Sequence, residues 1–550
     1  MLQLIECVPN FSEGRDLAVI KQITDEIEAV EGVKLLNVDP GHATNRTVVT
    51  MVGEPKAVLE AAFRAIKKAG ELIDMRSHKG EHPRMGATDV CPLIPIANIS
   101  MEETAAYALE LAKRVGETLN LPVYLYESAQ PNKERSNLSV IRNGEYEGFA
   151  TKILLPEWKP DFGPAVFDEK RGATVIGARD FLVAYNVNLN TTSTRRANAI
   201  AFDVREAGRN IEENGVKVNK PGSLKAVKAI GWFIEEYGIA QISINLTNIN
   251  ITPVHIAFDE VCSKAAARGI RVTGSELVGL VPLKAMLDAG RYFLEKQQRS
   301  TGVGEKELVR IAVKSMGLDD LKPFNPNERI IEYMLADNGG KKLVGMSLAD
   351  FADETASESP APGGGSIAAY VGALGISLAG MVANLSAHKK GWDARWQEFG
   401  AWADKAQQLK AELLRLVDAD TVAFNKIMEA FALPKTTAAE KSHRSEAIQQ
   451  ATKYAIAIPL KVMQASYASM EIIKAMAEAG NPNSVSDAGV GALCARSAVM
   501  GAFMNVRINA AGYNNKEEAE EFVAQGRAIE TAARAEEELI LQIVNEKIGL

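Results

Sequence analysis

The chain has 550 residues, 47% of them hydrophobic and 24% charged, with a net charge of −8 at pH 7 and a pI near 5.6. One hydrophobic core rarely organises so long a chain, so the length predicts two to four domains, each able to bury a core. The acidic balance argues against nucleic acid or an acidic membrane surface as the main partner, and still allows a local basic pocket for a small anion.

Cysteine spacing and the N-terminal residues bear on the compartment. Four widely scattered cysteines fit neither a disulfide framework nor the close ligand pairs of a structural zinc site. The N-terminal residues have no basic stretch before the first apolar run and do not read as a signal peptide. We therefore expect a reduced, cytoplasmic protein.

Residues 1–178 alternate short β-rich runs with amphipathic helical runs. Strands are expected at 2–8, 33–38, 46–52, 91–96 and 122–126, and helices at 17–30, 55–73 and 101–119. This order is typical of a split βαβ pattern in an α/β sandwich and not of a doubly wound sheet.

A similar pattern returns in residues 179–300. Strands are expected at 181–189, 229–237 and 240–249 and in the mixed run 271–282, and helices at 195–208, 254–269 and 283–296. The first 300 residues therefore predict two α/β sandwich subdomains, with a ligand in the cleft between them.

After a connecting segment and linker at 301–345, residues 346–550 predict an all-α antiparallel helix bundle. Helices are expected at 347–356, 364–387, 394–430, 437–478, 484–511 and 515–547. Residues 366–385 form a run of twenty residues without a charge, as a membrane span would. Half of them are Ala, Gly or Ser, so we expect a buried central helix that neighbouring helices approach closely.

The most distinctive chemistry lies in residues 76–92, which hold two of the six histidines, two arginines and two acids in a stretch too rich in Gly and Pro for a regular helix. Such a run can move protons and hold an anion. His82, flanked by Glu81 and Arg84, is the candidate general acid or base. His78 reads equally well as an exposed loop histidine. Nothing at metal-ligand spacing completes a site, so we expect no metal.

Three further segments could contribute to the same site. The turns at 10–15 and 39–46 follow predicted strand ends, and each is either a plain turn or a polar rim of the site. The loop at 158–167 carries three large aromatic side chains, whose apolar faces suit a flat heteroaromatic ligand.

In the helical half, three features could carry chemistry. The glycine run 363–365 opens the uncharged helix but lacks the residues of a phosphate-binding loop. Asp420 shares a predicted helix face with inward-pointing apolar residues (Leu413, Leu416, Val417, Phe424 and Ile427), and burial there would raise its pKa as a general acid requires. Asp418 lies off that face, and Asp487 has helix capping as its simplest interpretation.

Several long segments resemble known families. Residues 6–16, 39–48, 82–95 and 272–287 are similar to the formimidoyltransferases (glutamate formiminotransferases). Residues 361–375, 416–435, 484–493 and 505–512 are similar to the formimidoyltetrahydrofolate cyclodeaminases. In this order on one chain, they resemble the bifunctional formimidoyltransferase-cyclodeaminase family from end to end.

The resemblance implies transfer of a formimidoyl group from N-formimidoyl-L-glutamate to N5 of tetrahydrofolate, with His82 as the catalytic acid and base. The implied second reaction closes 5-formimidoyltetrahydrofolate to 5,10-methenyltetrahydrofolate and releases ammonia. Asp420 matches its catalytic aspartate best, with Asp418 as a rival and Asp487 as a further candidate. The implied substrate-binding residues are Asn10, Ser12, Asp39, Arg84, Gly163, Pro164, Ala165, Val166, Phe167, Asp168, Glu169, Lys170, Arg171 and Gly172.

The expected partners are small molecules, with tetrahydrofolate as a polyglutamylated co-substrate, and neither metal, nucleic acid nor membrane. We also expect a homo-oligomer. The sequence leaves two alternatives open: the donor could carry a formyl group, and the helical half could serve only as an assembly module.

Overall fold

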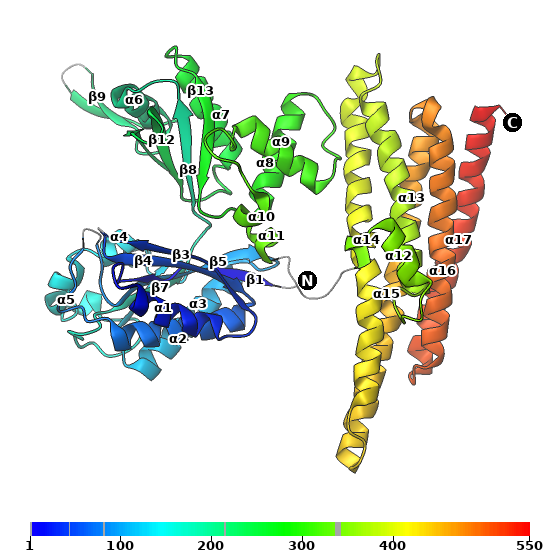
Figure 1. Cartoon of the computed structure of the whole chain (residues 1–550), viewed down its shortest axis with the longest axis horizontal. Coiled ribbons are helices and arrows are strands. Elements are labelled where there is room, and N and C mark those ends of the chain that lie inside the picture. Colours follow the sequence, from blue (N-terminus) through cyan, green and yellow to red (C-terminus); the bar gives the residue numbers. More distant parts are fainter. Residues whose placement is uncertain (1–2, 43, 81–82, 214–215, 336–342, 550) are drawn as a thin grey trace. The chain divides into compact units, whose positions relative to one another are not determined.

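The structure is a computed structural model that describes residues 3–42, 44–80, 83–213, 216–335 and 343–549. The chain forms two compact units, one of Met1–Ala285 with Met316–Ala336 and the other of Met286–Ser315 with Asp337–Leu550. The sheets belong to the first unit and the second unit is helical (Figure 1). A region of mixed sheets followed by a helical region is the order that the sequence predicts.

The first sheet has seven strands among the described residues, in the spatial order β1-β4-β2-β5-β7-β6, with β3 paired to β4. Neighbours are antiparallel except that β7 runs parallel to both β5 and β6. The strands are β1 (Leu4–Cys7), β2 (Asn10–Phe11), β3 (Val33–Gly41), β4 (Arg46–Gly53), β5 (Thr88–Ala97), β6 (Val123–Glu127) and β7 (Thr174–Ala178).

Helices α1 (Leu17–Glu28), α2 (Pro55–Leu72) and α3 (Met101–Leu119) pack on one face of this sheet. Their apolar stripes and alternate strand residues form the larger core of the subdomain. A smaller core lies on the opposite face, where α4 (Leu138–Ile141) and α5 (Glu145–Lys152) pack. The polar site described below also lies on this second face.

The second sheet has the order β11-β12-β8-β13, and each strand is antiparallel to its neighbours. Its strands are β8 (Val183–Leu189), β11 (Val227–Ile234), β12 (Ile239–Leu246) and β13 (Val272–Val278). Helices α6 (Thr194–Val204) and α7 (Val254–Ala266) pack on it, and β9 (Arg209–Glu213) and β10 (Val216–Lys220) form a separate hairpin. The helices that follow are α8 (Leu283–Lys296), α9 (Glu305–Met316), α10 (Pro326–Arg329) and α11 (Ile331–Leu335).

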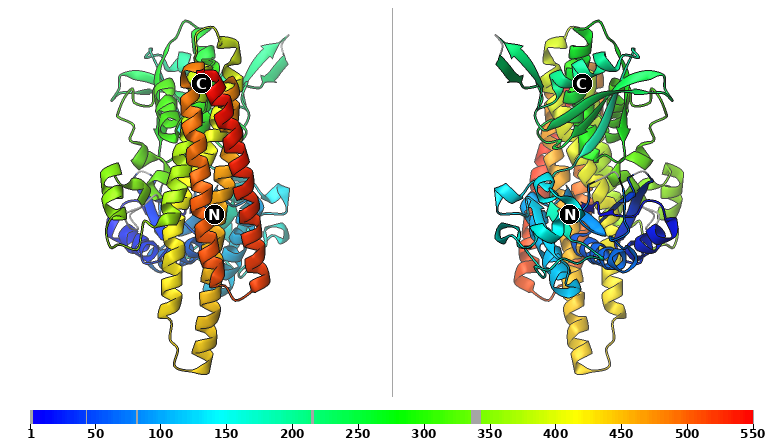
Figure 2. Two further views of the ribbon diagram at one scale, coloured as in Figure 1. Left: turned by 90° about the vertical axis from the view of Figure 1, so that its right-hand side faces the viewer. Right: turned by 90° about the vertical axis from the view of Figure 1, so that its left-hand side faces the viewer.

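The helical unit is built around α13 (Gly364–Ala387), which packs against α14 (Trp396–Ala432), α15 (Ala438–Ala479) and α16 (Val485–Ala511). Helix α17 (Lys516–Ile548) packs on α15 and α16, and α12 (Leu348–Thr355) precedes α13. The joined ends of α14 and α15 project beyond the other helices as a long hairpin (Figures 1 and 2).

Helix α13 confirms the expected buried central helix. Its glycines allow close packing: a Cβ on Gly375 would lie 2.9 Å from the carbonyl oxygen of Gly491 on α16. By length and hydropathy, both α13 and Pro482–Ala511 could cross a membrane, but 61% and 50% of their most apolar stretches are buried inside the helical unit.

The predicted helices of the second half agree with the structure within two residues at every end. Elsewhere the sequence patterns missed short or irregular elements. Strand β7 and the β9–β10 hairpin are additional, and α9 lies in the segment expected to be a connection. Residues 205–208, predicted to be helical, lie outside α6, because the backbone adopts an extended conformation at Arg205.

Candidate active sites

The run of residues 76–92 forms the connection from α2 to β5 and the first part of β5. His82 and Glu81 lie outside the described residues, so the catalytic role of His82 stays a prediction. Their described neighbours are anchored on the N-terminal side: the Asn45 side chain donates to the Lys79 carbonyl at 3.1 Å. Contacts of Arg84 anchor the run on the other side.

Arg84 is almost fully buried, with a side chain that is 8% exposed. Its terminal nitrogens donate to both carboxylate oxygens of Glu147, at 2.9 and 2.7 Å, and to Glu145 at 3.3 Å. This charge-assisted fork lowers the pKa of Glu147. Arg84 and its partners line a cavity of about 510 Å³ together with Lys79, Gly80 and Gly144. Because its nitrogens already have acceptors, a substrate-binding role for Arg84 stays a prediction.

His78 is not the exposed loop histidine that the sequence suggested. Its Nδ1 accepts a hydrogen bond from Arg84 Nε at 3.2 Å, and its Nε2 lies 2.8 Å from the Asn45 carbonyl oxygen. The first contact requires a lone pair on Nδ1 and the second a hydrogen on Nε2, which fixes the neutral tautomer. Burial lowers the pKa of His78, and the Arg84 charge lowers it further. His78 therefore positions the loop as a neutral group.

Two predicted polar residues share one row of the first sheet. Strand pairing places Asn10 opposite Val48 and Val48 opposite Asp39, so Asn10 and Asp39 lie on the same face across β4. Ser12 donates its hydroxyl to the Gly86 carbonyl at 2.7 Å and so connects β2 to the histidine run. The structure therefore brings the three polar segments together, although it does not test their contact with a substrate.

A second group of charges lies on the adjacent strands, and the sequence did not predict that its members lie together. Asp89 on β5 is fully buried; it accepts the backbone N–H of Met85 at 3.0 Å and forms an ion pair with Arg142. Arg46, at the start of β4, donates to the Asn10 side chain. Burial lowers the pKa of Arg46; the nearby negative charge of Asp89 opposes this shift, and the positive charge of Arg142 adds to it. Only the strand register reveals this cluster, although Arg46 belongs to the turn 39–46 already noted.

The loop of residues 163–172 packs against the same run. Gly172 pairs with Gly86 in an isolated antiparallel bridge. Phe167 packs against Tyr146 and Phe149, with ring centroids 5.5 and 5.8 Å apart. Of the predicted folate contacts, Pro164, Phe167, Asp168 and Arg171 are partly buried and Gly172 is buried, whereas Gly163, Ala165, Val166, Glu169 and Lys170 are exposed.

Glu6 on β1 is a buried carboxyl group that the apolar strand pattern concealed. Burial raises its pKa to about 7, although the nearby Arg179 charge opposes the shift. The thiols of Cys7 and Cys91 lie 3.4 Å apart beside it, and both are buried. An acid inside a short apolar strand is the signal that could have revealed Glu6.

Asp420 in the helical unit extends from α14 toward the first turn of α13. The Ser366 hydroxyl donates to its Oδ2 at 3.0 Å and also lies 3.1 Å from the Val417 carbonyl oxygen. Gly365 makes this approach possible, because a Cβ there would lie 2.2 Å from Asp420 Oδ1. Burial raises the pKa of Asp420, whereas the hydrogen bonds from Ser366 lower it. A partly buried acid beside a glycine-opened helix start can donate a proton to a leaving group.

The face of α14 that carries Asp420 is less completely buried beyond that residue, where Ala423 and Ala430 are buried but larger side chains are not. Leu413, Leu416 and Val417 are fully buried, as predicted, and Ile427 is partly buried. The prediction was wrong for Phe424, which is 38% exposed. Helix α13 begins beside Asp420, so the part of α14 beyond it has no α13 to pack against.

Comparisons with known proteins cover nearly the whole chain. The family model described as "Formiminotransferase domain, N-terminal subdomain" matches residues 4–179, "Formiminotransferase domain" matches 184–336, and "Formiminotransferase-cyclodeaminase" matches 347–528. The chain is 44% identical to a formimidoyltransferase-cyclodeaminase of Mus musculus over 92% of its own length and 93% of that protein.

The chain belongs to the formimidoyltransferase-cyclodeaminase family. Its first half is 45% identical to a glutamate formimidoyltransferase of Thermoplasma acidophilum, over 54% of this chain and 93% of that protein. Its second half is 35% identical to a methenyltetrahydrofolate cyclohydrolase of Methylorubrum extorquens, over 37% of this chain and 98% of that protein. These names favour formimidoyl over formyl chemistry, and an enzyme over an assembly module.

The two rivals of Asp420 occupy different structural positions. Asp418 accepts the backbone N–H of Leu343 at 2.8 Å and so holds the chain ahead of α12. Asp487 is the third residue of α16, whereas Ser484 occupies the capping position. Asp487 thus lies in the first helical turn, where its negative charge interacts favourably with the positive end of the helix dipole.

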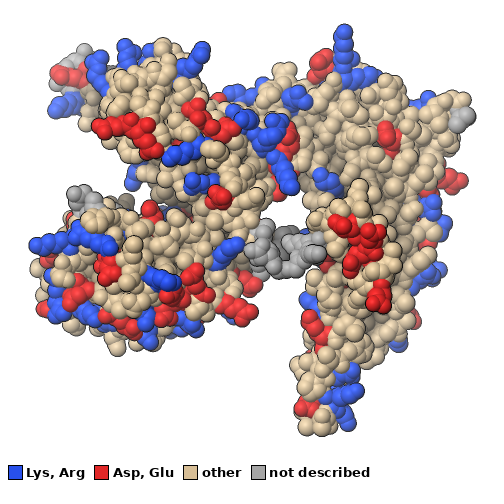
Figure 3. All heavy atoms as spheres, in the orientation of Figure 1, with Lys and Arg blue, Asp and Glu red and all other residues tan. Residues whose placement is uncertain are grey.

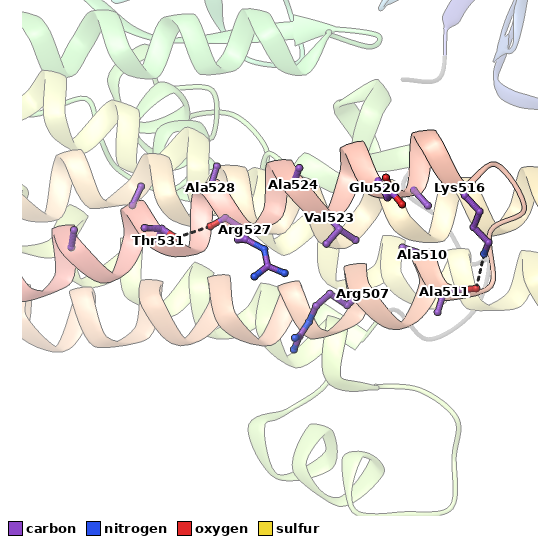
Figure 4. Close-up of a pocket in the computed structure, with 13 residues that line it drawn as sticks. Arg507, Ala510, Ala511, Lys516, Glu520, Val523, Ala524, Arg527, Ala528 and Thr531 are labelled. Atoms are coloured by element: carbon purple, nitrogen blue, oxygen red, sulfur yellow. Dashed lines mark hydrogen bonds between the residues drawn. The ribbon is translucent and has the colours of Figure 1, made fainter.

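A groove of about 1080 Å³ in the helical unit lies between α16 and α17 (Figure 4). Arg507 and Arg527 extend into it from the two helices, and Lys516 donates to the Ala511 carbonyl at one end. Alanines make up most of the remaining lining, at 510, 511, 519, 524, 528, 532 and 535. Neither Asp420 nor its rivals line this groove.

Surface charge and metal-ligand groups also bear on the expected partners. Acidic and basic side chains are interspersed over the visible face of the first unit (Figure 3). No group of three or more His, Cys, Asp or Glu side chains able to hold a metal ion occurs among the residues that the structure describes.

Proposed function

We propose that the chain catalyses two consecutive reactions. It transfers the formimidoyl group of N-formimidoyl-L-glutamate to N5 of tetrahydrofolate, and it then closes 5-formimidoyltetrahydrofolate to 5,10-methenyltetrahydrofolate with release of ammonia. The observation that carries this proposal is the 44% identity, over 92% of the chain, to a protein named for both activities. Separate matches of the two halves to enzymes support it.

In the first reaction, N5 of tetrahydrofolate attacks the formimidoyl carbon and the amine of glutamate leaves. His82 would take the N5 proton and return it to the glutamate nitrogen, so that one imidazole serves both steps. Its neighbours support this role, because the neutral His78 and the ion-paired Arg84 anchor the run that carries His82. Tetrahydrofolate would rest on the loop of residues 163–172, near the aromatic ring of Phe167.

In the second reaction, N10 attacks the same carbon and forms a five-membered ring, after which ammonia must leave. An amine departs readily only when protonated, and the Asp420 carboxyl would supply that proton and recover one from N10. Its raised pKa supports this role, because the protonated form then persists to higher pH. Asp418 stays the second candidate, and one of its oxygens accepts the backbone N–H of Leu343.

Several finer features belong to the same proposal. The two sheet domains would follow the split βαβ pattern, and the helices of the second unit would form an antiparallel bundle. The folate would carry a polyglutamate tail, with neither metal nor other cofactor. The protein would act in the cytoplasm on small molecules, without nucleic acid or membrane.

The chain would also act as a homo-oligomer. Helices α13 and α16 pack together and expose large apolar side chains, at Leu374, Met381, Leu385, Val490 and Leu493. A second copy of this uncharged face would cover them, because such faces are costly to leave in water. Sedimentation of the purified chain tests this expectation.

The proposal is tested by following methenyltetrahydrofolate absorbance from either starting point. His82→Ala should abolish its formation from N-formimidoyl-L-glutamate and leave closure of added 5-formimidoyltetrahydrofolate unchanged. Asp420→Asn should do the reverse: transfer continues and the uncyclised intermediate accumulates. Asp418→Asn is the matched variant two residues away, and closure should survive it. Closure that survives Asp420→Asn in a folded protein would remove Asp420 from the mechanism.

A further inference from the structure

Arg46 forms no ion pair with a carboxylate among the described residues. Asp89 forms its ion pair with Arg142 and attracts the charge of Arg46 only at longer range. Arg142 donates to both Asp89 oxygens, and the Met85 N–H donates to one of them. Arg142 and the Met85 N–H therefore hold the Asp89 carboxylate, and Arg46 has no carboxylate in contact with it among the described residues.

The donors of Arg46 are also incompletely used. One terminal nitrogen donates to the Asn10 side chain, a neutral acceptor. The Nε is buried and has no acceptor among the described residues. Arg84 differs, because each of its three nitrogens reaches an acceptor and two of them reach carboxylates. Of these two arginines, Arg46 is the one with bonding capacity to spare.

The position of Arg46 connects it to the proposed transfer site. Its neighbour Asn45 contacts both Lys79 and His78, in the run that continues to His82. Strand pairing also places Arg46 on the same face of the sheet as Val48, Asn10 and Asp39. An anion on Arg46 would therefore lie on the polar side of the sheet, beside the histidine run.

We propose that Arg46 binds one of the two carboxylates of the glutamyl donor, and so selects that donor. This inference rests on the proposed function, since it names the residue that recognises its substrate. A carboxylate supplies the two coplanar oxygens that a guanidinium binds as a fork, together with a negative charge. The alternative is that Arg46 only joins β2 to β4 through Asn10, in which case its loss would affect every donor alike.

The test compares three donors on the full-length protein: N-formimidoyl-L-glutamate, its α-amide and its γ-amide. Arg46→Gln should lower kcat/KM for the diacid by about tenfold or more. With the amide that lacks the recognised carboxylate, the kcat/KM of Arg46→Gln should lie within about twofold of that of the unmodified protein. The KM for tetrahydrofolate should also differ by no more than about twofold between the two proteins. The amide that escapes the loss identifies which carboxylate Arg46 binds.

Equal losses for all three donors would overturn the inference. Arg76→Gln is the matched control. Arg76 is an exposed arginine at the start of the histidine run, and it already forms an ion pair with Asp74. If Arg46→Gln does not fold, Arg46→Lys decides by the same comparison, since lysine keeps the charge and loses the fork. Failure of the unmodified protein to use any of the three donors, with closure of added 5-formimidoyltetrahydrofolate intact, would instead reject the proposed transfer.

Discussion

Replacement of Glu6 by glutamine should remove a loss of folding stability that the first unit undergoes as the pH rises. The folded protein raises the pKa of Glu6 from 4.5 to about 7, chiefly through burial. Each pKa unit corresponds to about 1.4 kcal/mol, so ionising this group in the folded state costs about 3 kcal/mol. Because the folded state holds its proton more tightly than the unfolded chain, stability falls as the pH rises from about 4.5 to about 7 and then stays level.

Glutamine stays neutral at every pH, so the variant should not show this loss. Near pH 4.5 the two proteins should be equally stable, and at pH 8 the variant should be more stable by up to about 3 kcal/mol. The gain will be reduced by the loss of the attraction between the Glu6 carboxylate and Arg179. Hydrogen exchange of β1 and β5 peptides between pH 5 and 8, corrected for intrinsic rates, measures the difference, with peptides of the helical unit as the internal control. Parallel pH dependence in the two proteins would refute the reasoning.

Three further substitutions test the geometry of the two sites. Gly365→Ala should slow cyclisation by about tenfold or more and leave transfer intact, because its Cβ would lie 2.2 Å from Asp420 Oδ1. Gly364→Ala, with its nearest contact at 3.7 Å, should preserve both rates, and equal effects of the two would contradict the prediction. Ser366→Ala removes a hydrogen bond that favours the ionised form of Asp420, so its pKa should rise further and the decline of cyclisation with increasing pH should move to higher pH. A profile that moves the other way would count against Asp420 as the acid. Gly163→Ala should destabilise the first unit by about 2 kcal/mol or more in thermal unfolding, since this glycine has φ +79° and no space for a side chain; an unchanged transition would show that the loop relaxes.

The helices of the second half could be predicted almost to the residue, because their length and periodicity leave few alternatives. Asp420 also followed from sequence, since its position on an apolar helix face predicts burial. Arg46 and Glu6 could not be identified in this way. The importance of Arg46 depends on which strands lie beside β4, and that of Glu6 on which face of β1 is covered. The neutral state of His78 could be assigned only from the hydrogen bonds of both ring nitrogens, which the sequence pattern does not predict.

The bridge between Gly86 and Gly172 affects how this enzyme can be re-engineered. A Cβ on Gly86 would lie 2.3 Å from the Ala173 carbonyl oxygen, and one on Gly172 would lie 2.1 Å from that of Met85. The two backbones therefore fit together only while both residues lack side chains. A chimera that takes the loop of residues 163–172 from a relative must also inherit residues 76–92, or keep both glycines. For recombination, the two segments are one exchangeable part, although seventy residues of sequence separate them.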